Sequence, residues 1–144
     1  MNRKPYLLFL LLSVIFFSAC KKASTPVKTT MTLYFNGDSS WTSSNVTTQN
    51  DGSGTVYITG NSADGNNSLA LDIGDYRAGN ATYTIASINT PHGSFASYET
   101  VGTAYAAVSG QIVVTDYSTN TIQGSFSFTS AKANISGTFT ATTP

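Results

Sequence analysis

The chain has few of the residues on which catalytic and metal sites are usually built. Its 144 residues include one cysteine, one histidine and one tryptophan, and charged residues make up only 10% of it. With Cys20 alone, no disulfide can form within the chain, and zinc lacks its usual set of ligands. A histidine-based catalytic site would need His92, which lies in a predicted Pro-His-Gly loop without an evident nucleophile or orienting partner. We therefore predict no catalytic residue, no metal site and no cofactor.

Basic residues are also scarce in most of the chain. From residue 31 to residue 144, Arg77 and Lys132 stand against seven acidic residues, which leaves a formal charge of −5. A domain with two cations cannot neutralise a row of phosphates. Nucleic acid is therefore excluded as a partner.

The first twenty residues resemble a bacterial lipoprotein signal peptide. Arg3 and Lys4 form a basic start, an apolar run covers residues 6–17, and Ser18-Ala19-Cys20 places small residues before a cysteine. The apolar run is too short for a membrane-spanning helix, which needs about 20 such residues. The resemblance implies that residues 1–19 are removed and that Cys20 is acylated and begins the mature chain.

Residues 20–30 are expected to connect the lipid to a folded domain. The segment is polar and contains Pro26 and three lysines, which is typical of a flexible tether. Lysines beside a lipid anchor strengthen binding to anionic membranes. Lys21, rather than Asp, follows the cysteine, and this resembles outer-membrane sorting of bacterial lipoproteins. We expect the periplasmic leaflet of the outer membrane, with the cell surface as the alternative.

Residues 31–144 are predicted to form a single all-β domain. Leucine occurs there only at positions 33, 69 and 71, while β-branched and aromatic residues are common, so long helices are not expected. Apolar residues recur with period two, which is the pattern of a half-buried strand. Turns rich in Gly, Asn and Asp separate these runs. The pattern predicts about nine short antiparallel strands in a sandwich or a barrel. Residues 104–108 fit a strand or one helical turn, and the alternation around Tyr105 favours a strand.

A short repeat of apolar, polar, Gly, polar and apolar residues occurs three times near the C-terminus. It covers residues 108–112, 122–126 and 135–139. Because side chains alternate along a strand, each glycine should face the same side as the apolar residues around it. A glycine there leaves room for a large ring from a neighbouring strand. We predict that Gly110, Gly124 and Gly137 lie on the core face of neighbouring antiparallel strands, with Phe126 or Phe139 covering at least one of them.

The same region carries a family resemblance. Residues 105–115, 122–128 and 135–139 resemble the C-terminal half of small Bacteroidota-type envelope lipoproteins that contain a domain of unknown function. Phe35-Asn36-Gly37 with Trp41 resembles their opening strand and turn. The resemblance implies an all-β exported domain without an assigned activity, so it carries over no catalytic residue.

Two further patterns have both a chemical and a structural explanation. Gly37-Asp38-Ser39 matches a nucleophile motif of some esterases, but those enzymes are α/β proteins, and an Asn-Gly-Asp turn explains the residues better. Several turns contain an aspartate beside Gly or Asn, which are residues that tight turns favour in any case. The spacing of a calcium loop is absent, and the sequence leaves calcium binding by these turns open.

Aromatic side chains are the remaining candidates for recognition. Trp41 follows a predicted turn among small polar residues, Tyr57 lies on the strand face opposite Val56 and Ile58, and Tyr117 lies in a predicted turn. We predict these three aromatic residues as ligand contacts, with a buried Trp41 as the alternative. The predicted function is a membrane-tethered binding or interaction module of the cell envelope, whose partner is a glycan or an envelope protein. The alternative is a structural or adhesion-type lipoprotein without a small ligand, and an enzyme ranks third.

Overall fold

Strands make up the regular structure of the computed structural model, which describes residues 26–86, 90 and 92–144. The signal-peptide and Cys20 predictions lie outside the described residues. Within this part of the chain, no helix is long and apolar enough to cross a membrane. The strands are β1 (Thr30–Phe35), β2 (Asp38–Ser43), β3 (Asn45–Asn50), β4 (Val56–Asn61), β5 (Asn67–Ile73), β6 (Ala81–Ile85), β7 (Phe95–Thr100), β8 (Thr103–Tyr117), β9 (Thr121–Ser130) and β10 (Asn134–Thr142).

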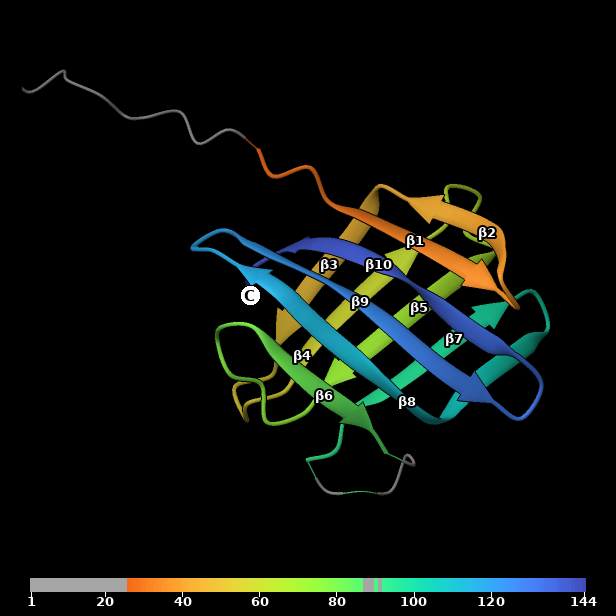
Figure 1. The fold of residues 1–144 in the computed structure, drawn as a ribbon. Coiled ribbons are helices and arrows are strands. Elements are labelled where there is room, and N and C mark those ends of the chain that lie inside the picture. The colour runs from red at the N-terminus through yellow and green to blue at the C-terminus, as the bar shows by residue number, and fades with distance from the viewer. Residues whose placement is uncertain (1–25, 87–89, 91) are drawn as a thin grey trace, which may run out of the picture.

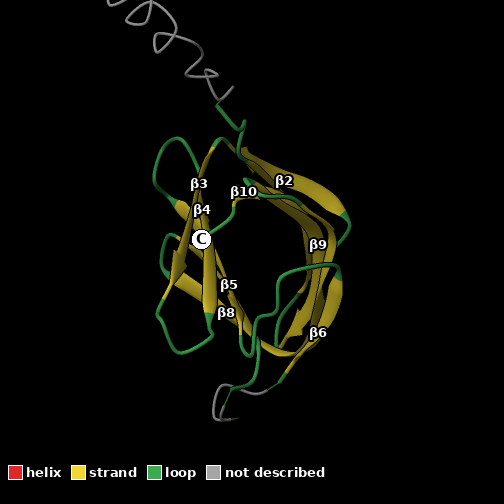
Figure 2. Cartoon of the chain, turned by 90° about the vertical axis from the view of Figure 1, so that its left-hand side faces the viewer, coloured by secondary structure: helices red, strands yellow, loops and turns green. Residues whose placement is uncertain are grey.

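The strands form one antiparallel sheet that folds on itself into a nearly closed barrel. Their order is β2-β1-β10-β9-β8-β7-β5-β4-β3, and β6 pairs with β8 outside this path. Figures 1 and 2 show two facing layers. The front layer contains β1, β2, β6, β9, β10 and most of β8; the rear layer contains β3, β4, β5, β7 and the first residues of β8. The predicted all-β antiparallel architecture is confirmed.

Strand β8 passes from one layer to the other at a bulge. Residues 103–106 pair with β7, and the part after them pairs with β9. The register shifts between Ala107 and Ser109, so Val108 is the extra residue, and its side chain is 56% exposed. A bulge bends and twists a strand, which is how one strand can join two layers. The strand prediction for residues 104–108 is confirmed, but the prediction that Val108 faces the core is wrong because the bulge reverses the alternation.

A second corner joins the layers between β2 and β3. Ser43 ends β2 and is buried, with an exposed fraction of 2%. Its hydroxyl donates to the carbonyl of Asn61 in β4 and accepts a hydrogen bond from the Asn45 backbone N–H at 2.9 Å. These bonds hold the bend at Ser44, so β2 and β3 act as one bent strand that passes from the front layer to the rear layer.

Apolar side chains of the two layers fill the space between them. The core consists of Met31, Leu33, Val46, Val56, Ile58, Leu69, Leu71, Ile73, Ile85, Ala96, Tyr98, Ala107, Ile112, Val114, Ile122, Phe126, Phe128, Ala133, Ile135, Phe139 and Ala141. Met31 of β1 packs over Gly60 of β4, where an added Cβ would lie 2.5 Å from its sulfur. A glycine on one layer thus makes room for a long side chain from the other.

The three repeated glycines each face a phenylalanine on a neighbouring strand. Gly124 pairs with Phe139, Gly137 with Phe126 and Gly110 with Phe128. Gly124 and Gly137 are buried, and a Cβ added at either one would collide with the facing ring. The predicted placement on the core face under aromatic rings is confirmed for Gly124 of β9 and Gly137 of β10. Gly110 of β8 is half-buried, and an added Cβ there would meet the Ser127 carbonyl and the Phe128 Cα and Cβ atoms.

The two chain ends of the domain leave the barrel at the same side. Thr30, at the start of β1, pairs with Thr140 near the end of β10, and the Thr143 N–H donates to the Asn120 carbonyl in the β8–β9 turn. The β1–β2 turn lies at the opposite end, where the Asn36 N–H donates to the Asn134 carbonyl at 2.8 Å. Figure 1 shows the end of the barrel at which both termini leave, which we call the tether end after the predicted tether, and the opposite, distal end.

Candidate functional site on the outer face of the rear layer

The register of the rear layer arranges its outward side chains in rows across the strands. One row crosses β3, β4, β5 and β7 and consists of Gln49, Tyr57, Asp72 and Phe95. The next row consists of Thr47, Thr59, Ala70, Ser97 and Ala106. The first row carries large side chains and the second carries small ones. The second row is therefore a lower strip of the surface beside the first, and we call it the low floor.

Asp72 lies between two aromatic side chains in the first row. It pairs directly with Tyr57 of β4 on one side and with Phe95 of β7 on the other. All three side chains are half-buried, although they point away from the core. Directly paired residues on neighbouring strands have Cα atoms about 4.5–5.5 Å apart, which brings their side chains into reach of each other. We call Tyr57, Asp72 and Phe95 the aromatic–carboxylate row.

The turn before β4 fixes Tyr57. Asp51 Oδ1 accepts the Ser53 backbone N–H and Oδ2 accepts the Ser53 hydroxyl, at 2.8 and 2.7 Å, and the Tyr57 hydroxyl lies 3.5 Å from Oδ2. The hydrogen bond from the Ser53 side chain is the main cause that lowers the pKa of Asp51. Burial, and then the charges of Asp51 and Asp72, raise the pKa of Tyr57. Tyr57 is therefore a neutral hydroxyl at the edge of an acidic surface.

Asp72 is unusual among the acidic residues because it is partly removed from water on a solvent-facing side of the sheet. Burial raises the pKa of its carboxyl group above the ordinary value of 3.8. Among the described residues, the structure records no ion pair or side-chain hydrogen bond to Asp72. A half-buried carboxylate without a protein partner costs stability, and it offers two acceptor oxygens to a ligand that donates hydrogen bonds.

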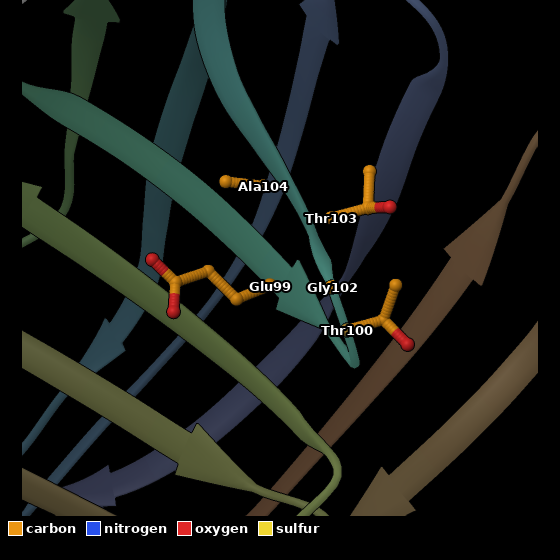
Figure 3. A pocket seen from close by; sticks show the side chains of 5 residues that line it. All are labelled: Glu99, Thr100, Gly102, Thr103 and Ala104. Atoms are coloured by element: carbon orange, nitrogen blue, oxygen red, sulfur yellow. The ribbon is translucent and has the colours of Figure 1, made fainter.

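A shallow hollow of about 360 Å³ lies at the β7–β8 hairpin and is lined by Glu99, Thr100, Gly102, Thr103 and Ala104. Figure 3 shows that Glu99 and Ala104 point to one side of the hairpin and Thr100 and Thr103 to the other. The polar side chains do not converge on a common space. The hollow therefore lacks the arrangement of a ligand pocket.

Trp41 packs on the inner side of the barrel. It pairs with Leu33, which is fully buried, and its ring lies half-buried against the core. Its Nε1 atom is buried without a hydrogen-bond partner within the described residues. This placement corresponds to the core alternative that the sequence left open for Trp41.

Tyr117 lies at the end of β8, far along the chain from Tyr57, and is 37% exposed. Two other tyrosines stack beside this end of the barrel: the ring centroids of Tyr76 and Tyr83 are 6.3 Å apart. Burial raises the pKa of Tyr76 to about 12, with smaller contributions from Tyr117 and Tyr83. The Tyr83 hydroxyl bonds to both the N–H and the carbonyl of Arg77 at 3.1 Å, so these rings hold the 74–80 loop against the barrel.

His92 has an acidic neighbour that the sequence did not predict. Its Nδ1 lies 3.7 Å from Asp75 Oδ1, and the two side chains are 67% and 72% exposed. Gly74 allows this approach, because a side chain there would collide with the His92 and Gly93 carbonyls. Both partners are in water, which differs from the buried, oriented pair that activates a nucleophile.

The aspartates of the turns bond to their own loops. Asp64 Oδ1 accepts hydrogen bonds from the Ser62 hydroxyl and the Asn66 N–H. In the same way, Asp51 Oδ1 accepts a hydrogen bond from the Ser53 N–H in its own turn. In the described part of the chain, no group of three His, Cys, Asp or Glu side chains could hold a metal ion. These bonds are the Asx turns that explain aspartate beside Gly and Asn.

Sequence reasoning singled out Tyr57 but missed Asp72 and Phe95. The three residues come from different strands, and only the pairing of β4, β5 and β7 brings them together. One signal was present: Asp72 is the only charged residue within β5, between Leu71 and Ile73. The structure does not bring Trp41, Tyr57 and Tyr117 into one site.

One family model matches most of the chain. Neither the curated proteins nor the solved structures include a significant match. A family model described as a domain of unknown function, DUF6252, matches residues 30–143, which covers all ten strands. The chain therefore belongs to the DUF6252 family.

Proposed function

We propose that this protein is a membrane-tethered lipoprotein of the cell envelope that acts as a binding module. The lipoprotein assignment is supported by the basic start, the apolar run and the small residues before Cys20. Acylated Cys20 is the membrane contact, and residues 20–30 are the tether. Lys21, rather than Asp, follows Cys20 and supports an outer-membrane location, in the periplasmic leaflet or, as the alternative, at the cell surface.

The geometry of the domain fits this role. Thr30 marks the tether end, so the distal end of the barrel and its two outer faces project away from the lipid. Strand β10 has nine residues, and a strand rises about 3.4 Å per residue, so the distal turns lie roughly 30 Å from the tether end. The outer faces are thus free to meet a partner beside the membrane.

The aromatic–carboxylate row is the observation that carries the binding proposal. An aromatic pair beside a half-buried carboxylate provides stacking surface and hydrogen-bond acceptors on the outside of the barrel. The inside is occupied by side chains of the core. Recognition on an outer face requires no reacting group, and the proposal is therefore a non-enzymatic one.

A structural or adhesion-type lipoprotein is the second candidate. Strand β3 is an end of the sheet path and pairs with β4. Its six residues, Asn45–Asn50, contain neither a charge nor a proline, which are the devices that usually prevent edge-to-edge association. A second chain could add a strand at this edge and build an assembly without a small ligand.

Site-specific photo-crosslinking in cells tests the binding role. A crosslinker placed at residue 57 should capture an envelope component, whereas the same group at residue 45, on β3 and outside both rows, should capture a partner if the strand edge assembles. Absence of any adduct from both positions, in cells that contain the lipidated protein, would contradict a binding or assembly role.

A further inference from the structure

The aromatic–carboxylate row has a chemistry that selects among ligand classes. Tyr57 and Phe95 flank Asp72 at one strand spacing each, so the two aromatic residues are about 10 Å apart across the sheet. Ring faces at this spacing can contact the apolar C–H faces of a sugar chain, while the carboxylate between them accepts hydrogen bonds from hydroxyl groups.

We propose that Tyr57, Asp72 and Phe95 bind an uncharged, pyranose-containing polysaccharide. This inference rests on the proposed binding function and names its ligand class. The low floor formed by the second row, with Thr59, Ala70 and Ser97 beside the aromatic–carboxylate row, leaves room for the sugar units that follow.

The negative charges at the row restrict the charge that a ligand can carry. Asp72 and Asp51 both lie close enough to Tyr57 to raise its pKa, and within the described residues the structure records no ion pair to either carboxylate. A uronate or phosphate group would therefore meet two carboxylates whose charge no ion pair offsets. Anionic polysaccharides are therefore disfavoured.

The partial burial of the Asp72 carboxylate favours hydrogen bonds from ligand hydroxyl groups over those from water. Burial already removes part of the hydration of the Asp72 carboxylate, so a ligand displaces little water when it binds. A buried hydrogen bond to a charged acceptor is stronger than one between neutral groups. Hydroxyl groups of a neutral sugar would restore the hydrogen bonds that the carboxylate lacks within the described structure.

The test measures binding of the purified full chain, in detergent, to an array of neutral and acidic polysaccharides. We expect binding to a neutral polysaccharide that persists in 1 M NaCl, because no ion pair forms. Tyr57→Ala and Asp72→Asn should each weaken it by about tenfold or more. Tyr34→Ala is the matched control: Tyr34 is an exposed tyrosine on the outer face of the front layer, and its removal should leave affinity unchanged.

Several results would overturn the proposal. They are binding only to acidic glycans, binding that salt abolishes, equal losses in Tyr57→Ala and Tyr34→Ala, and no glycan binding at all. Denaturation midpoints of all variants separate lost binding from lost folding. A protein adduct at residue 57 without glycan binding would contradict the sugar ligand and leave the binding function intact, whereas no adduct and no glycan would contradict both.

Discussion

Gly137 of β10 lies directly opposite Phe126 of β9, and a Cβ added at Gly137 would be 2.5 Å from the Phe126 Cζ atom. Two residues further along the strands, Phe139 of β10 lies directly opposite Gly124 of β9 and covers it in the same way. The two strands thus exchange rings over each other's glycines. This arrangement explains why glycine, normally unfavourable within a strand, recurs in the repeat.

Substitution of Gly137 by valine should destabilise the domain. The added side chain would collide with the Thr32 backbone carbonyl and overpack the interior against the Phe126 ring, which should cost about 1–3 kcal/mol of unfolding free energy, or more. Ser136→Val, on the outward side of the same strand, is the control and should change stability by no more than about 0.5 kcal/mol. Urea denaturation measures both, and equal midpoints for the two variants would contradict the packing described here.

Replacement of Asp72 by asparagine should raise the stability of the domain at pH 7. Because the folded-state pKa of Asp72 is raised, its ionised form costs stability at neutral pH. The advantage of Asp72→Asn should shrink as the pH falls through the raised folded-state pKa and vanish below the ordinary value of 3.8. Asp38→Asn, at an exposed carboxylate, is the control. A variant less stable than wild type at pH 7 would contradict the desolvation of Asp72.

Fluorescence of Trp41 should be typical of a ring in the core. The emission maximum should be shifted to short wavelength and acrylamide should quench it weakly, because the ring packs against buried residues and its Nε1 atom is covered. Trp41 is the only tryptophan, so the signal has one source. Quenching as strong as in the denatured chain would show that the ring contacts water.

Tyr76→Phe should make the domain more resistant to alkali. The hydroxyl of Tyr76 is buried without a partner in the described structure, and its pKa is raised to about 12. Between the ordinary value of 10.0 and about 12, the unfolded chain ionises at this residue while the folded one does not, so stability falls as the pH rises. Tyr76→Phe should lose this part of the decrease in stability with rising pH. Unfolding curves at pH 9 and pH 11 provide the comparison, with Tyr34→Phe as control.

Substitution of Cys20 by alanine should abolish lipid attachment. Cells that express wild type or Cys20→Ala are labelled with a fatty-acid analogue and fractionated. Label should appear in the wild-type protein only, and the variant should leave the outer-membrane fraction. Label retained by the variant would contradict acylation at Cys20.

The local pattern of apolar and turn residues was enough to predict an all-β fold. Alternation such as Val56-Tyr57-Ile58 places apolar side chains on one face of a strand, and turns of Gly, Asn and Asp interrupt the runs. Strand β2 and strand β3 lack such alternation, since β3 has one apolar residue, Val46. Their strand conformation follows from pairing with β1 and β4, which sequence periodicity does not encode.

By itself the sequence determined the all-β class, the core positions of Gly124 and Gly137, the acidity of the domain and the outward direction of Tyr57. Each of these depends on composition or on neighbours along one strand. Only the tertiary structure decided that Val108 leaves the core, that Trp41 joins it, and that Asp72 lies between Tyr57 and Phe95. These outcomes depend on a bulge, a corner and strand pairing between distant segments. The packing of the whole chain selects such contacts, and no local pattern of residues specifies them.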